Sequence, residues 1–209
     1  MASLLGGELA HSLAATLLRL AVGFACGAVP ALALGLWAGW SPRARAAIDP
    51  VVAAFHPVPK IAFLPLLMLL VGIGESSRLV IIALGACFPV LLNAMAGVRQ
   101  IPALHFEVAG NYGADAWLVF RRVVVPGSLP AVLTGMRLGL NRALLLTITV
   151  ELIGAPDGLG ALIWLARETL RTEELYGALA LIMAMGIGMN AVLRRARLWA
   201  GPWLTDSER

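Results

Sequence analysis

Lysine, cysteine and histidine are all scarce in this chain of 209 residues, and each scarcity excludes a class of site. Lys60 is the single lysine, so the sequence has no GxxxxGK[ST] loop of the kind that holds nucleotide phosphates. The chain therefore cannot hydrolyse ATP by that route. His11, His56 and His105 are scattered and form no cluster with metal-ligand spacing. No Ser-His-Asp or Cys-His arrangement indicates nucleophilic catalysis, so we expect neither an enzyme nor a metal site.

Cys26 and Cys87 both lie in apolar stretches, without a spacing that indicates a metal site or a disulfide. We expect both to be small buried side chains. The N-terminus has no basic region and no A-x-A site, which argues against a cleaved signal peptide.

Charge is also scarce, and this places the chain in a membrane. Charged residues make up 13% of the sequence and hydrophobic residues 60%, whereas soluble domains average about 25% and about 45–50%. A soluble fold of this size could not bury so much apolar surface. Five apolar blocks suit membrane crossing, at about Ser12–Trp40, Ile61–Ile73, Leu79–Val98, Ser128–Ile153 and Leu175–Leu193. We therefore predict an all-α, polytopic membrane protein with about five transmembrane helices, forming one domain over residues 1–209.

The second block is short, and spans only if it recruits residues 51–59 before it. Pro57 and Pro59 make that approach extended and non-helical. Pro65 removes a helical hydrogen bond, and we expect it to kink the span. After the fourth block, a Gly-rich turn and an apolar helical face predict a short interfacial helix, with the face formed by Leu159, Leu162, Ile163 and Ala166.

The basic residues are distributed unevenly between the two sides of the predicted membrane. Residues 41–60, residues 99–127 and the tail from 194 hold 10 basic residues, whereas the opposite side holds 3, namely Arg78, Arg167 and Arg171. The positive-inside rule then places the first set, the C-terminus and residues 99–127 in the cytoplasm. No run of five like charges exists, so we expect no nucleic-acid partner.

A polar segment, residues 106–130, interrupts the apolar pattern. Residues 107–112 fit one short helix, Gly113 permits a sharp change of direction, and Asp115 can cap a second short helix. We expect Pro126 to stop that second helix and Pro130 to lie in the first turn of the next span. An interfacial helix lying on the lipid headgroups is the alternative interpretation, but it gives no reason for the spacing of the glycine and prolines.

The segment "EVAGNYGADAWLVFRRVVVP" resembles the EAA loop of ABC-importer permeases. The positions of that signature are occupied by Glu107, Val108, Ala109, Gly113, Val123, Val125 and Pro126. Val108 stands where the family has its first alanine, and Val125 stands where it has leucine. The likeness covers residues 11–193, in which "HPVPKIAFLPLLMLLVGIGESSRL" and "GMRLGLNRALLLTITVELIGAPDGLGALI" are similar to the nitrate, sulfonate and taurine branch.

The resemblance implies a type I importer permease fold in a bacterial inner membrane, lacking the usual first helix. Close relatives have one more span before Ser12, so the start is annotated late, the protein is a shortened variant, or the sequence is a fragment. The segment at about 105–127 would be a coupling helix that docks on a separate ATP-binding subunit, with Tyr112 among its contacts. That subunit would use ATP and Mg²⁺, while this chain binds no cofactor. A second permease copy and an extracytoplasmic substrate-binding protein are the other implied partners.

Candidates for the solute pathway are fewer. Pro59 and Pro65 break the backbone at membrane depth, as transporter substrate sites often do, although a plain turn into a kinked helix is the simpler interpretation. Arg142 and Glu151 lie within the fourth block, and an internal arginine suits an anionic solute. Arg137 is a weaker candidate that can also snorkel, and Glu151 can also sit at the outer interface. An ion-coupled secondary transporter and a non-transporting membrane scaffold remain as alternative functions.

Overall fold

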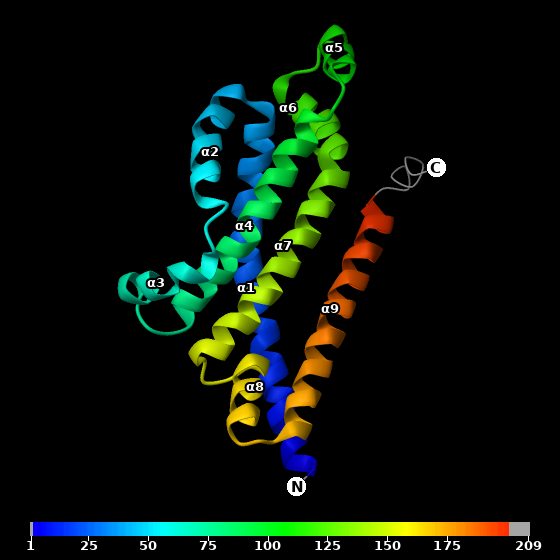
Figure 1. The fold of residues 1–209 in the computed structure, drawn as a ribbon. Helices are drawn as coiled ribbons and strands as arrows, with labels where there is room; N and C mark the ends of the chain where they lie inside the picture. Colours follow the sequence, from blue (N-terminus) through cyan, green and yellow to red (C-terminus); the bar gives the residue numbers. More distant parts are fainter. Residues whose placement is uncertain (1, 201–209) are drawn as a thin grey trace.

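A computed structural model describes residues 2–200, and every regular element in that range is helical (Figure 1). The elements in chain order are α1 (Ala2–Trp40), α2 (Pro42–Phe55), the 3-10 turn η1 (Lys60–Phe63), α3 (Leu64–Val71), α4 (Glu75–Arg99), α5 (Ala103–Asn111), α6 (Ala116–Val119), the π-helical turn η2 (Phe120–Val124), α7 (Val125–Gly154), α8 (Leu159–Glu168) and α9 (Thr172–Ala200).

Four helical stretches in the described range are long and apolar enough to cross a membrane, and a bent pair could make a fifth. The four are Gly7–Trp40, Glu75–Arg99, Ala116–Gly154 and Thr172–Arg195. They coincide with four of the five predicted blocks, which confirms the all-α membrane class. The fifth candidate joins α2 to η1 and α3, and it bends by 88°.

The predicted cause of that bend was wrong. Pro65 lies in the first turn of α3, where a missing backbone N–H costs no hydrogen bond, so it does not kink the helix. The change of direction falls between Phe55 and Lys60 instead. There Pro59 adopts an extended conformation (φ −59°, ψ 114°) directly before η1, as predicted. The prediction was wrong for residues 51–55, which are helical and belong to α2.

Three long helices, α1, α4 and α7, lie side by side and form the core of the molecule (Figure 1). Glycines let their backbones approach closely. A Cβ at Gly27 of α1 would clash with the Ala83 carbonyl oxygen of α4, and one at Gly139 of α7 would lie 3.0 Å from the Ala86 carbonyl oxygen. Small residues at helix contacts are the usual means of packing helices in lipid, where apolar burial between helices gains little.

The remaining helices lie around this core. Helix α8 packs against α7 and α9, and α9 lies at the edge of the bundle (Figure 1). Of the four spans, α9 is the least buried. The prediction of a short helix after the fourth block is confirmed by α8. The two cysteines are free thiols, as expected, but Cys26 is exposed rather than buried, because it lies on the outer side of α1.

Candidate functional site

The helical insert, residues 103–124, projects from one end of the three-helix core (Figure 1). Helix α5 ends at Asn111, and Gly113 follows with φ +72°, a left-handed conformation that favours glycine. The Asp115 side chain then accepts a hydrogen bond from the Leu118 backbone N–H at 2.7 Å and caps α6. The predicted turn at Gly113 and the predicted cap at Asp115 are thereby confirmed, whereas the second helix is not a separate short one.

We had predicted from the sequence that the second helix of the insert stops at Pro126, and this prediction was wrong. Helix α6 continues through η2 into α7, so that Ala116–Gly154 is one helical stretch of 39 residues. In η2 the Val125 N–H bonds to the Phe120 carbonyl, the i to i−5 pattern of a π turn. Pro126 follows in the first turn of α7, where it needs no donor, and Pro130 lies inside that helix rather than in its first turn.

Most of the insert is exposed. No residue of α5 or α6 is buried, and Tyr112 and Trp117 keep 88% and 67% of their surface accessible. One aromatic contact fastens the insert to the core, because the Phe120 ring lies 5.7 Å from the Trp40 ring and 6.0 Å from the Trp117 ring. Large exposed aromatic side chains on a projecting element are typical of a surface that contacts another protein.

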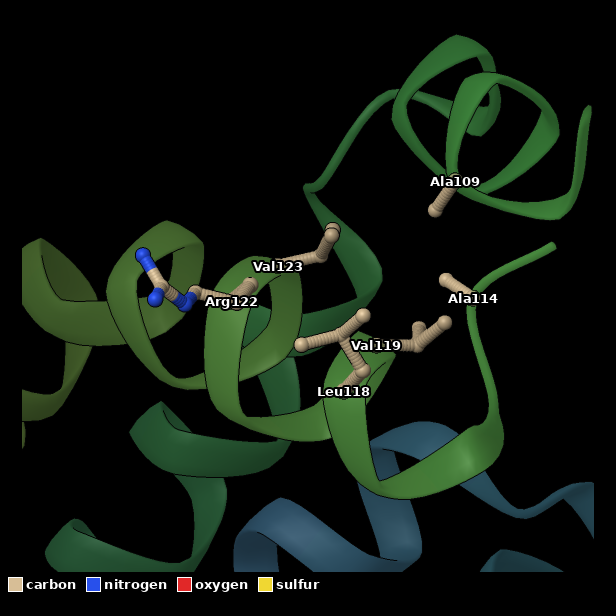
Figure 2. A pocket seen from close by; sticks show the side chains of 6 residues that line it. All are labelled: Ala109, Ala114, Leu118, Val119, Arg122 and Val123. Carbon is tan, nitrogen blue, oxygen red and sulfur yellow. The ribbon is translucent and has the colours of Figure 1, made fainter. Parts of the chain in front are cut away.

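A notch of about 360 Å³ lies between α5 and the start of the long helix (Figure 2). Its lining is apolar apart from one guanidinium, and consists of Ala109, Ala114, Leu118, Val119, Arg122 and Val123. Two of the predicted site residues, Ala109 and Val123, therefore meet here. Glu107, Tyr112 and Gly113 lie outside the notch and are exposed. Pro126 lines a separate hollow of about 440 Å³, which Val123 also lines.

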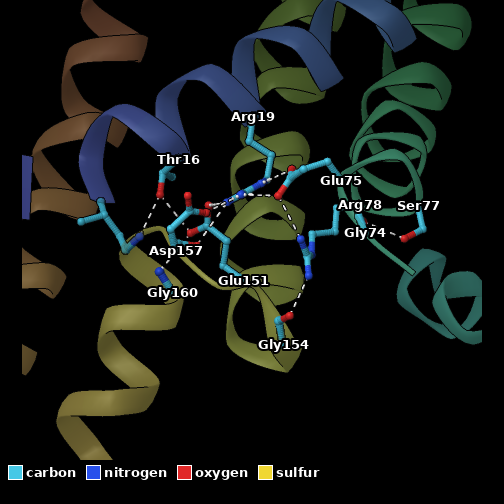
Figure 3. A network of polar contacts seen from close by, with 11 residues as sticks. Thr16, Arg19, Gly74, Glu75, Ser77, Arg78, Glu151, Gly154, Asp157 and Gly160 are labelled. Atoms are coloured by element: carbon cyan, nitrogen blue, oxygen red, sulfur yellow. Dashed lines mark hydrogen bonds and ion pairs between the residues drawn. The ribbon is translucent and has the colours of Figure 1, made fainter. Parts of the chain in front are cut away.

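At the opposite end of α7, charged side chains from three helices and the loop after α7 meet in an ion cluster (Figure 3), formed by Arg19, Glu75, Arg78, Glu151 and Asp157. Arg19 is its centre. Its Nε and Nη2 donate to the two Glu75 carboxylate oxygens at 2.8 and 2.7 Å. Nη2 also donates to Asp157 Oδ1 at 2.8 Å, and Nη1 donates to Glu151 Oε1.

Glu151 is fully engaged in this cluster. Its residue is 1% exposed, and its Oε2 accepts hydrogen bonds from Thr16 Oγ1 at 2.9 Å and from the Gly160 N–H at 3.0 Å. Thr16 Oγ1 in turn accepts from the Leu159 N–H at 2.8 Å, at the start of α8. Glu151 therefore faces protein groups near the end of α7, and its position at the outer interface stays a prediction. A pathway role for it stays a prediction, but its oxygens already bind α1 and α8.

The other pathway candidates are not brought together. Pro59 and Pro65 lie at the start of η1 and α3, and Arg142 is exposed on α7. Their roles stay predictions. Arg19, Glu75 and Asp157 were not predicted from the sequence, although one signal pointed to Arg19. Arg19 and Glu151 are opposite charges inside separate apolar blocks, and such charges in membrane helices usually pair with one another.

Among residues 2–200, no group of three or more His, Cys, Asp or Glu side chains could hold a metal ion. The carboxylates of the ion cluster bind guanidinium groups instead.

The chain is similar in sequence to known membrane transport proteins. The family model described as binding-protein-dependent transport system inner membrane component matches residues 31–206. The taurine transport system permease protein TauC of Escherichia coli (strain K12) is 34% identical over 193 residues, which cover 90% of this chain and 70% of TauC. The nitrate import permease protein NrtB of Synechocystis is 28% identical over 173 residues, covering 83% of this chain and 63% of NrtB.

A chain of the MetNI methionine ABC transporter, solved in inward-facing conformations, has the same fold. It superposes with a TM-score of 0.75 at 20% identity, covering 89% of this chain and 93% of that one. The chain therefore belongs to the family of binding-protein-dependent transport system inner membrane components, the ABC transporter permeases, in the branch that holds TauC and NrtB.

Proposed function

We propose that this chain is the membrane subunit of an ATP-driven importer for a small anion such as taurine, another sulfonate or nitrate. Its family and the names of TauC and NrtB support the solute class. The chain would pair with a second copy of itself, receive solute from an extracytoplasmic binding protein and contact a separate ATPase subunit that uses ATP and Mg²⁺. The excess of basic residues near the insert and the C-terminus supports a cytoplasmic position for both.

The observation that carries this proposal is the exposed insert at the end of a continuous helix. A partner that grips α5 and α6 would hold the end of Ala116–Gly154, because η2 joins α6 to α7 without a break. The notch lined by Ala109 and Val123 offers a place for an apolar side chain of that partner. Glu107, exposed on α5, and Arg122, at the rim, would add directional polar contacts.

A crosslinking experiment tests the contact with the ATPase subunit. The chain has two tyrosines, Tyr112 in the insert and Tyr176 at the start of α9, and they are 88% and 70% exposed. We expect a photoreactive group at position 112 of the assembled transporter to crosslink to the ATPase subunit. The same group at position 176 should not, because it lies at the other end of the molecule.

The proposal is contradicted if position 112 reaches only lipid. Uptake into proteoliposomes supplies the second test. We expect uptake of labelled taurine or nitrate to require ATP on the side of the insert. Uptake that follows a proton gradient without ATP would establish a secondary transporter instead.

A further inference from the structure

An open groove lies between α7 and α9, away from both the insert and the ion cluster. Its volume is about 790 Å³, within the range of small-molecule sites. Its lining includes polar and apolar side chains from both helices, among them Thr134, Arg137, Met183, Ile187, Asn190 and Arg194. We call it the α7–α9 groove.

Arg137 is the unusual member of this groove. It is the thirteenth residue of α7, whose 30 residues run from Val125 to Gly154, so its backbone lies well inside the span. Its Nε donates to Asn190 Oδ1 at 2.9 Å. Within residues 2–200, no carboxylate lies within 4 Å of its guanidinium, whereas Arg19 and Arg78 in the ion cluster each contact acids. A guanidinium inside a membrane span needs protein, water or an anion to face.

Asn190 positions this guanidinium, and the hydroxyl of Thr134 is bonded within its own helix. Thr134 Oγ1 donates to the Pro130 carbonyl at 3.0 Å, and Asn190 Nδ2 donates to the Gly186 carbonyl at 2.8 Å. Asn190 is thereby held with its oxygen toward Arg137 Nε. The two terminal nitrogens of Arg137 remain for an oxyanion, which a guanidinium binds through parallel N–H···O bonds.

The rest of the lining suggests the shape of the anion. Met183 and Ile187 of α9 give the groove an apolar wall, and both are exposed to it. A ligand with a charged oxyanion head and a short alkyl body would use both the guanidinium and this wall. Nitrate has no alkyl body, so it would contact the guanidinium and not the apolar wall.

We propose that the α7–α9 groove is a solute site on the transport pathway, in which Arg137, positioned by Asn190, binds the sulfonate group of a small alkanesulfonate. This assignment rests on the proposed function, since it locates the solute of that importer. A phospholipid headgroup carries a similar oxyanion and is the competing source of the same chemistry.

Thiol labelling tests the site without ATP, so its outcome is separate from that of the proposed function. In a chain whose two native cysteines are replaced by alanine, Ile187→Cys places a thiol in the groove. Tyr176→Cys, on the same helix and similarly exposed at 70% against 72%, serves as the matched control outside it. We expect ethanesulfonate to protect position 187 from a neutral maleimide and to leave position 176 unprotected. Adding Arg137→Gln should abolish this protection.

Transport gives the second readout. For the complete transporter in proteoliposomes, we expect Arg137→Gln to raise the KM for labelled taurine about tenfold or more, because a charge-assisted hydrogen bond is lost. Arg195→Gln, which removes an exposed arginine one residue beyond the groove, should leave the KM unchanged. Arg137→Lys keeps the positive charge but lacks the two parallel N–H donors of the guanidinium, so it should give an intermediate KM.

Three results would overturn the assignment. The first is protection at position 187 that persists in the Arg137→Gln chain. The second is an unchanged KM for taurine in a transporter whose wild type takes up taurine with ATP. The third is a loss of co-purified anionic lipid in the Arg137→Gln chain without a change in KM, which would assign the groove to a headgroup. A wild type that needs no ATP for uptake would contradict the proposed function and not this site.

Discussion

The two ends of the helical stretch Ala116–Gly154 are built in opposite ways. At the Gly154 end, five charged side chains from α1, α4, α7 and the following loop form the ion cluster, and the Glu151 carboxylate accepts three hydrogen bonds. At the Ala116 end, the helical insert is mostly exposed, and it meets the core at Phe120 and at the buried Val124. Burying charges is costly unless each is paired, so a fully bonded cluster ties its helices together. An exposed element with few contacts is free to meet a partner.

The two ends of this helix therefore have different physical tasks. The ion cluster fixes α7 relative to α1 and α8, because Arg19 and Thr16 of α1 and Gly160 of α8 all bind Glu151. In the insert, at the far end of the same helix, α5 and α6 hold no buried residue. Substitutions at the first end should therefore lower stability, and substitutions at the second should disturb coupling while the fold survives.

Arg19→Met should have the largest effect. It leaves Glu75, Glu151 and Asp157 without the guanidinium that bonds them, and breaking a buried pair costs about 3–5 kcal/mol. We expect a large fall in the thermal midpoint of the detergent-solubilised protein, followed by tryptophan fluorescence. The matched control is Arg171→Met, which breaks the exposed pair with Glu174 and should cost about 1 kcal/mol or less. Equal effects at the two arginines would refute the assigned role of the cluster.

Thr16→Val sharpens the same comparison with a smaller change. The substitution keeps the shape of the side chain but removes the hydroxyl that bridges Glu151 Oε2 and the Leu159 N–H. A buried N–H left without a partner costs about 1–3 kcal/mol. We expect a lower midpoint and faster hydrogen exchange at Leu159 and along the first turn of α8. Thr149→Val on α7, whose hydroxyl bonds only to the Leu145 carbonyl of its own helix, is the control and should change little.

The sequence predicted the helices well and their contacts poorly. Apolar runs placed α1, α4, α7 and α9 because the length of a span is set by the bilayer itself. The bond between Arg19 and Glu151 joins positions 132 apart, and no periodicity states which faces of two helices meet. The close approaches at Gly27 and Gly139 were missed for the same reason.

The insert shows where local chemistry suffices and where it fails. Gly113 and Asp115 were predicted correctly, since a left-handed turn and an N-cap depend on neighbouring residues. Pro126 was predicted to stop the helix, which is its usual effect. Instead, a π turn at Phe120–Val124 joins α6 to α7, so the helix continues through Pro126. Such a turn has no clear sequence signal. The roles of Glu107 and Tyr112 in coupling stay predictions.

Gly113→Val tests the insert end. Valine at φ +72° costs about 1–2 kcal/mol, but a Cβ there meets no atom within 4 Å, so the strain stays in the insert. We expect a nearly normal thermal midpoint together with ATP hydrolysis that no longer drives taurine uptake. Gly110→Val is the control, since it also meets no atom within 4 Å and lies within the helix α5. A Gly113→Val transporter with normal ATP-driven uptake would show that the geometry of the insert is not needed for coupling.

The smallest expected effect is that of Asp115→Ala, which removes the cap of α6. Loss of an N-cap costs about 1 kcal/mol of local helix stability, and the Leu118 N–H that it frees is exposed to water. Since η2 and α7 hold the chain from Phe120 onward, we expect fraying to stop there. Hydrogen exchange should therefore quicken at Leu118 and Val119 and stay unchanged at Val132, which is buried in α7. Faster exchange at Val132 would mean that the insert and α7 unfold together, and the contrast between the two ends of the helix would then be lost.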